Sequence, residues 1–183
     1  MDIRAKMRQI RDAKGAILVV GLGISGYETA LRLSQAGYRV ICVDEKSEES
    51  MLSQGRGSWA DSIRKAGGEV LFGIQGEDIE PFASSVEMAV FSPGVSLETA
   101  IGGAVKRRGI PIINELELSL SIMESKTILV TGSNGKTTTA TLIHHILSLE
   151  SRVNPILCGN VGTPAIAYLK PNELTALESL KDR

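Results

Sequence analysis

The sequence is poor in cysteine and in aromatic residues. It holds two cysteines, and aromatic residues make up 4% of its 183 residues. Cys42 and Cys158 lie far apart in apolar stretches, so they form neither a disulfide framework nor the close spacing of a metal site. We expect both to be buried, reduced thiols, which is consistent with a reducing compartment.

Long apolar runs and an excess of charge are also missing. The first residues, MDIRAKMRQIRDAKG, are charged and lack the apolar core of a signal peptide. No stretch approaches the roughly 20 apolar residues of a membrane span. The net charge is −1, so the protein as a whole would not attract nucleic acid or a membrane surface electrostatically. We therefore expect a globular protein of the cytoplasm.

What is present is an alternation of two patterns, in a chain that is 43% hydrophobic. Short apolar runs predict strands, and amphipathic stretches between them predict helices. The predicted strands are 16–21, 38–44, 70–72, 88–91 and 111–113. The predicted helices are 24–36, 59–66, 97–108 and 115–123, with a polar loop at 45–57. This βαβα order indicates a parallel sheet covered by helices on both faces.

The same order begins again in the last third of the chain. Residues 126–132 predict a strand, 136–149 a helix and 154–158 another strand. We therefore place a domain boundary near 121–125. A sheet begun at Lys126 would have only two strands by residue 183, too few to bury both of its faces. We expect the chain to be an incomplete part of a longer protein.

A glycine-rich loop, G-x-G-x-x-G, follows the first predicted strand at residues 21–26. Its first glycine permits a tight turn, its second lets a ligand approach the backbone, and its third lets helix and strand pack closely. The free N–H groups of the following helix favour an anion. Asp44 ends the next strand, where a ribose-binding acid is expected. The loop indicates a nucleotide-type ligand without specifying it. A purely structural turn, with Asp44 as a solvated cap, is the alternative.

A second glycine loop, TGSNGKTT, occupies residues 131–138 between an apolar run and a predicted helix. Backbone N–H groups of such a loop wrap phosphate oxygens. Lys136 is placed to meet the β- and γ-phosphates, and the hydroxyl of Thr137 is placed to bind Mg²⁺. The spacing G-x-x-G-K-T is shorter than that of the standard phosphate loop. The alternative is a polar helix start with a chance G-K-T.

The short phosphate loop resembles that of the Mur ligases, and other segments resemble the same family in the same order. These segments are GLGISG at 21–26, SPGV at 92–95, NELEL at 114–118 and GNVG at 159–162. Together with the phosphate loop they cover most of the chain. The S-P-G turn resembles the branch of the family that adds D-glutamate rather than the branch that adds L-alanine.

The resemblance implies a fold and a reaction. The fold would be α/β, with a Rossmann-like parallel sheet domain at 1–123 and the start of a P-loop ATP-binding α/β domain at 124–183. The reaction would be an ATP-dependent ligation of peptidoglycan synthesis. It would join D-glutamate to UDP-N-acetylmuramoyl-L-alanine through an acyl phosphate, with ATP and Mg²⁺ as cofactors and the protein as a monomer.

The resemblance also implies site residues, and it gives the first loop to UDP rather than to NAD. Residues implied to contact the UDP-linked substrate are Ile24, Ser25, Asp44, Glu45, Lys46, Gly94 and Asn160. Residues implied to hold ATP are Gly132, Ser133, Asn134, Gly135, Lys136, Thr137 and Thr138. Lys136 and Thr137 would be the catalytic residues, with Thr137 on Mg²⁺.

Two other interpretations stay open. An NAD(P)-binding oxidoreductase or sensor would explain residues 16–44 but not the second loop. A non-catalytic nucleotide-binding remnant would explain the length of the chain. Residues 171–183 lack the apolar run of the strand that the family places next, so Glu178 is given no role. We expect that this chain alone does not ligate.

Overall fold

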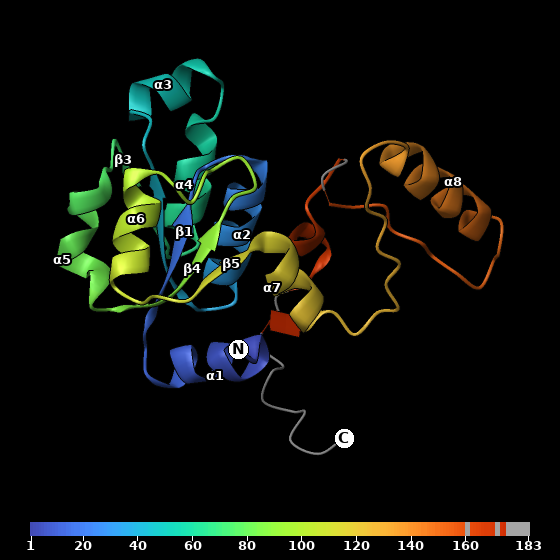
Figure 1. Cartoon of the computed structure of the whole chain (residues 1–183), viewed down its shortest axis with the longest axis horizontal. Coiled ribbons are helices and arrows are strands. Elements are labelled where there is room, and N and C mark those ends of the chain that lie inside the picture. The colour runs from blue at the N-terminus through green and yellow to red at the C-terminus, as the bar shows by residue number, and fades with distance from the viewer. Residues whose placement is uncertain (160–161, 171–172, 175–183) are drawn as a thin grey trace.

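The computed structural model describes residues 1–159, 162–170 and 173–174. It is built around one five-stranded sheet with the order β3-β2-β1-β4-β5, in which every neighbouring pair is parallel (Figure 1). The strands are β1 (Ala16–Val20), β2 (Arg39–Asp44), β3 (Glu69–Phe72), β4 (Val86–Phe91) and β5 (Ile112–Asn114). The α/β class and the parallel sheet are therefore confirmed.

The two faces of the sheet belong to two separate cores, because successive side chains of a strand point to opposite faces. Ile17 and Val19 of β1 face one core, and Leu18 faces the other. The first core is covered by α1 (Ile3–Asp12), α2 (Ile24–Gln35), α4 (Gly57–Lys65) and α7 (Glu115–Ile122). The second is covered by η1 (Gly76–Ile79), α5 (Glu80–Ala83) and α6 (Ala100–Arg107). Burial on both faces explains why the strands read as unbroken apolar runs.

Helices α1 and α3 (Glu48–Ser53) form where the sequence analysis predicts none, as do the shorter α5, η1 and η2 (Ala165–Tyr168). Helix α1 begins after Asp2, whose carboxylate accepts the N–H of Ala5 at 3.1 Å, and it buries Met7 and Ile10. Helix α3 forms inside the stretch predicted as a loop at 45–57. Ser47 caps it by accepting the N–H of Ser50 at 3.2 Å. Both helices are short or highly charged, and a cap side chain starts each of them.

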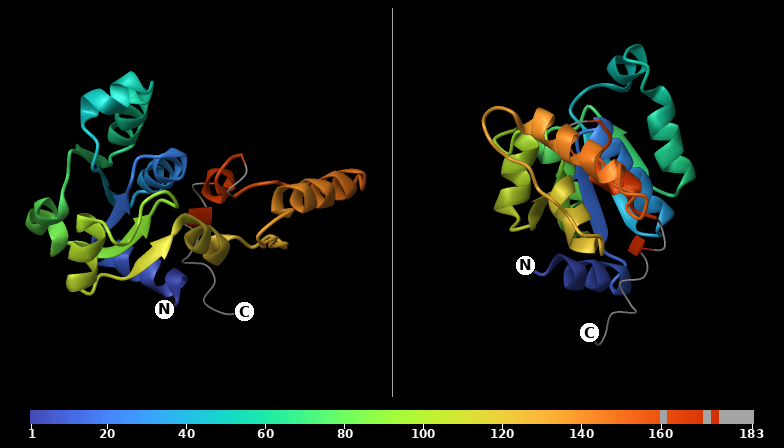
Figure 2. Two further views of the ribbon diagram at one scale, coloured as in Figure 1. Left: turned by 45° about the horizontal axis from the view of Figure 1, so that its top comes forward. Right: turned by 90° about the vertical axis from the view of Figure 1, so that its right-hand side faces the viewer.

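The predicted strands at 126–132 and 154–158 are wrong for the described residues, because neither segment pairs with a strand. The side chains of Ile128, Leu129 and Ile156 are 62%, 66% and 52% exposed. Apolar, β-branched residues favour a strand only where a neighbouring strand and a packed face exist. The helix predicted between them does form, as α8 (Lys136–Ser148), and it stands apart from the sheet in Figure 1 and in the left view of Figure 2.

The chain returns to the sheet unit after this excursion. The helical turn η2 (Ala165–Tyr168) contacts α7 and α2. Ile166, Leu169 and Leu174 are buried in the same core as Leu118 of α7. Residues beyond the predicted boundary thus complete the core of the first unit, and the division into 1–123 and 124–183 stays a prediction.

Candidate nucleotide sites

The first glycine loop lies where the strand order changes direction, since β1 has β2 on one side and β4 on the other. Ligands of open parallel sheets bind at this point, beyond the carboxyl ends of the strands. The hydroxyl of Ser92, just after β4, donates to the carbonyl of Gly21 at 2.7 Å. The loops that follow β1 and β4 are therefore joined into one wall of the predicted site.

The three glycines of this loop differ in what the fold demands of them. Gly21 has a φ of +92°, and a Cβ there would lie 2.5 Å from Val95. A Cβ on Gly26 would lie 1.8 Å from the Gly21 carbonyl oxygen. Gly23 has a φ of −80°, and a Cβ placed there would have no atom within 4 Å. The fold itself therefore requires glycine at 21 and 26 but not at 23.

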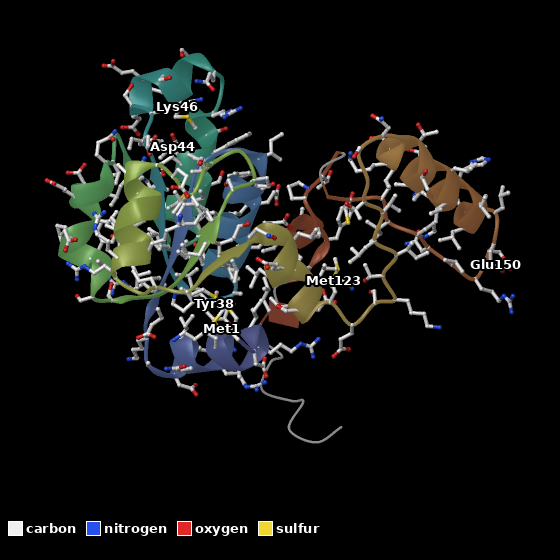
Figure 3. All side chains as sticks on the ribbon, in the orientation of Figure 1. Met1, Tyr38, Asp44, Lys46, Met123 and Glu150 are labelled. Atoms are coloured by element: carbon white, nitrogen blue, oxygen red, sulfur yellow. The ribbon has the colours of Figure 1, made fainter. Side chains whose placement is uncertain are left out.

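Asp44 closes the loop onto the end of β2. Its Oδ2 accepts the N–H of Leu22 at 2.6 Å, and its Oδ1 accepts the N–H of Lys46 at 2.9 Å. An ionised carboxylate has about four acceptor positions, so both oxygens keep capacity for a ribose hydroxyl. Glu45 and Lys46 are exposed beside it. Figure 3 shows Asp44 and Lys46 together at this edge of the molecule.

The other residues predicted to contact the UDP-linked substrate lie at the same edge where the structure describes them. Ile24 is 55% exposed at the start of α2, and Ser25 follows it, half-buried. Gly94 is exposed in the turn after β4, which the N–H of Val95 closes onto the Ser92 carbonyl at 2.9 Å. Asn160 lies outside the described residues. The contacts of these residues with a ligand stay predictions.

The second glycine loop is exposed along its whole length, from Thr131 to Thr139. Gly132 and Gly135 have φ values of +148° and +76°, and Gly135 is the N-cap of α8. The ammonium of Lys136 folds back onto the loop, where it donates to the carbonyls of Gly132 and Ser133. The first N–H groups of α8 and one lysine thus meet at a single exposed point, which is an arrangement that favours an anion.

The predicted residues therefore form two groups, and among the described residues no hydrogen bond joins them. Ile24, Ser25, Asp44 and Gly94 gather at the carboxyl edge of the sheet. The group around Lys136 belongs to α8, away from the sheet (Figure 1).

No helix in the described ranges is both long enough and apolar enough to cross a bilayer.

Glu115 is a buried polar residue that the sequence analysis does not single out. It lies in the N-E-L-E-L segment, is only 4% exposed, and begins α7. Its Oε1 accepts the hydroxyl of Ser119 at 2.9 Å and the N–H of Ile166 at 2.7 Å. Burial, and after it the charge of Glu115, raises the pKa of the Cys158 thiol. Glu115 thus ties the first unit to the segment that follows the G-N-V-G loop.

Comparison with known proteins finds a family model that includes the second loop, and relatives that match most of the chain. The family model described as the Mur ligase middle domain matches residues 130–181. UDP-N-acetylmuramoylalanine--D-glutamate ligase of Caldicellulosiruptor saccharolyticus is 38% identical over 155 residues, which is 84% of this chain and 32% of the relative. The ligases of the same name from Shouchella clausii and Bacillus thuringiensis are 34% and 35% identical over 87% and 88% of this chain. The chain spans about a third of the length of these relatives.

Proposed function

Because this chain belongs to the Mur ligase family, we propose that it carries the UDP-substrate site and the ATP phosphate loop of a D-glutamate-adding ligase. The relatives named for this activity match both the sheet unit and the segment around Lys136. The proposed substrates are UDP-N-acetylmuramoyl-L-alanine, D-glutamate and ATP. The protein would act as a monomer in the cytoplasm, without nucleic acid or membrane as a partner.

The proposed reaction forms an amide in two steps. The carboxylate oxygen of the L-alanine unit attacks the γ-phosphorus of ATP, which gives an acyl phosphate and ADP. The amine of D-glutamate then attacks the acyl carbon, phosphate leaves, and the amine loses a proton. Lys136 and the N–H groups at the start of α8 would neutralise the charge of the transferring phosphoryl group.

Thr137 is the residue that we propose for Mg²⁺. Its side chain is exposed in the first turn of α8, next to Lys136, and a hydroxyl is the kind of hard oxygen ligand that Mg²⁺ takes. The ion would contribute positive charge at the β- and γ-phosphate oxygens when bound. Among the described residues, no three His, Cys, Asp or Glu side chains form a cluster that could hold a metal ion.

Gly23 is the observation that carries the nucleotide site. It is the N-cap of α2 with an extended backbone and no side-chain cap. Serine or aspartate is preferred at such a position because its side chain accepts a free helix N–H. The structure has room for that side chain. Glycine at 23 therefore leaves the helix without a capping hydrogen bond, and packing gives no reason for it. The close approach of a ligand to the backbone accounts for it.

The test replaces Gly23 with serine and measures two properties. We expect the free energy of unfolding to stay the same or rise, because a cap is added. We expect the affinity for UDP or UDP-N-acetylmuramoyl-L-alanine in calorimetry to fall by about tenfold or more, which is about 1.4 kcal/mol. Gly103→Ala is the control, since its added methyl in α6 meets only the Arg107 side chain, at 3.3 Å.

Titration with other ligands separates this proposal from the alternatives. Binding of NADH in place of UDP would support an oxidoreductase or sensor module and end the ligase assignment for the first loop. Lys136→Ala should weaken ATP binding and leave UDP binding unchanged, because the two groups share no hydrogen bond among the described residues. Binding of neither nucleotide would identify a remnant. Ligation by the 183-residue chain alone, at the rate of a full-length relative, would contradict the expectation that it is incomplete.

A further inference from the structure

Helix α1 lies across the two places where the chain leaves the sheet unit and returns to it. Met7 and Ile10 are fully buried in the first core, and Ile3 packs against it. The same core holds Ile122, at the end of α7, and Leu174, on the returning segment. Helix α1 therefore contacts α7 and shares one buried core with the segment that returns from the excursion.

Arg4 binds the point of departure. Its Nε donates to the Ser121 carbonyl, and its Nη2 donates to the carbonyls of Ile122 and Met123 at 3.2 and 3.5 Å. The last carbonyls of a helix have no partner within the helix. The planar guanidinium, with donors on several nitrogens, can serve three of them at once. One half-buried side chain of α1 thus caps α7 just before the chain leaves the sheet.

Arg11 binds the returned segment beyond η2. Its Nη2 donates to the Leu174 carbonyl at 2.9 Å, and its guanidinium lies 4.6 Å from the centre of the Tyr38 ring. The buried hydroxyl of Tyr38 donates to the same carbonyl at 3.2 Å. Arg4 and Arg11 lie seven residues apart, about two turns along α1, and from this one helix they hold the chain before the excursion and after its return.

We propose that α1 is a clamp, with Arg4 and Arg11 as positioning residues: Arg4 fixes where the chain leaves the sheet unit after α7, and Arg11 holds the returned segment at Leu174. The clamp lies away from the predicted substrate edge: Figure 3 shows Met1 and Tyr38 at one end of the sheet unit and Asp44 and Lys46 at the other. It can therefore set the direction of the chain toward Lys136 without touching a nucleotide. The mechanical role rests on these contacts alone, and its value for catalysis rests on the proposed function.

The experiment measures the distance between two spin labels in the 183-residue chain by electron paramagnetic resonance. The labels sit on cysteines introduced at Lys65 of α4 and at Ser125, which are both exposed, in a Cys158→Ser background. Cys42 is fully buried and stays unlabelled. In the parent we expect one narrow distance distribution. Arg4→Ala should broaden it, and Arg4→Lys should narrow it again only in part, because an ammonium holds its donors on one nitrogen, whereas the Arg4 contacts come from two nitrogens of a planar guanidinium.

Controls make the result specific to the clamp. Gln9→Ala changes an exposed residue of α1 and should leave the distribution narrow. Arg11→Ala, with a second label at Glu173 in place of Ser125, should broaden the distribution for the returning segment. A broad distribution in the parent, or arginine variants that match Gln9→Ala, would overturn the proposal. UDP affinity is measured on the same samples, so failure of the clamp and failure of the substrate site are distinguishable.

Discussion

Replacing Glu115 with alanine should detach residues 165–168 from the sheet unit while leaving the sheet folded. The carboxylate accepts the N–H of Ile166 and the hydroxyl of Ser119 inside a buried contact between α7 and η2. Alanine supplies no acceptor, so both donors lose this partner. The Ile166 amide would then have to reach water, which requires the contact between α7 and η2 to open.

The size of the effect follows from burial. A buried donor left without a partner costs about 1–3 kcal/mol, and Ile166 and Ser119 are both fully buried. Removing the carboxylate also removes the free-energy cost of burying it, which offsets part of this loss. We therefore expect a net loss of about 2–3 kcal/mol for Glu115→Ala. Glu115→Gln keeps a carbonyl acceptor and should lose about 1 kcal/mol.

Glu117 gives a matched control on the same helix. Its Oε2 accepts the N–H of Asn114 at 2.8 Å in a capping box, but the pair is exposed. Glu117→Ala should cost about 0.5–1 kcal/mol, since water replaces the lost acceptor. Urea unfolding measures all three variants, and hydrogen exchange of the Ile166 amide locates the change. If Glu115→Ala is no worse than Glu117→Ala, or the Ile166 amide stays protected, the buried-carboxylate argument is wrong.

Three further outcomes are expected. Gly26→Ala should destabilise the chain by about 1–3 kcal/mol in urea, because its methyl would lie 1.8 Å from the Gly21 carbonyl oxygen and the loop must move. Burial raises the pKa of the Cys42 thiol. Above about pH 8.5 the unfolded chain therefore releases a proton that the folded chain keeps. The free energy of unfolding should then fall by up to about 1.4 kcal/mol for each further pH unit. Cys42→Ala should remove this part of the slope in urea titrations at pH 8 and pH 10, and an unchanged slope would contradict the assignment. Because burial first and the Glu115 charge second raise the pKa of Cys158, Glu115→Gln should speed its alkylation at pH 8, as followed by mass spectrometry.

The sheet unit could be predicted from the sequence because its central strands β2, β1 and β4 are buried on both faces. Such strands read as continuous apolar runs, and glycine turns mark their ends. Residues 126–132 have the same local pattern but form no strand, since strand formation depends on a neighbour that no local pattern contains. Helix α1 is the converse case: it forms, but the sequence pattern did not predict it. It has as many cations as apolar residues, and only the spacing of Ile3, Met7 and Ile10 marks the buried face.

The parts of the candidate site that depend on residues close together in the sequence could be predicted. The parts that depend on contacts between distant segments could not. The glycine spacing at 21–26 and 132–135 shows directly in the sequence, as does an acid at the end of β2. That Asp44 binds two backbone N–H groups of neighbouring loops depends on the fold. Glu115 looks like a solvated residue of a helix start, and its partner Ile166 lies 51 residues further along the chain. A polar residue whose role is to join distant segments leaves no periodic signal.

The two glycine loops differ in what holds their shape, and this difference makes the proposed tests independent. The first loop is fixed by tertiary contacts: Ser92 binds Gly21, and Asp44 binds Leu22. A ligand there meets a backbone that is already placed, so little ordering opposes its binding. The second loop is shaped by its own glycines and by Lys136, which donates to carbonyls of the same loop and must leave them to reach a phosphate. We therefore expect changes in the first loop to alter contact with the proposed ligand, and changes in the second to alter the shape of the loop itself.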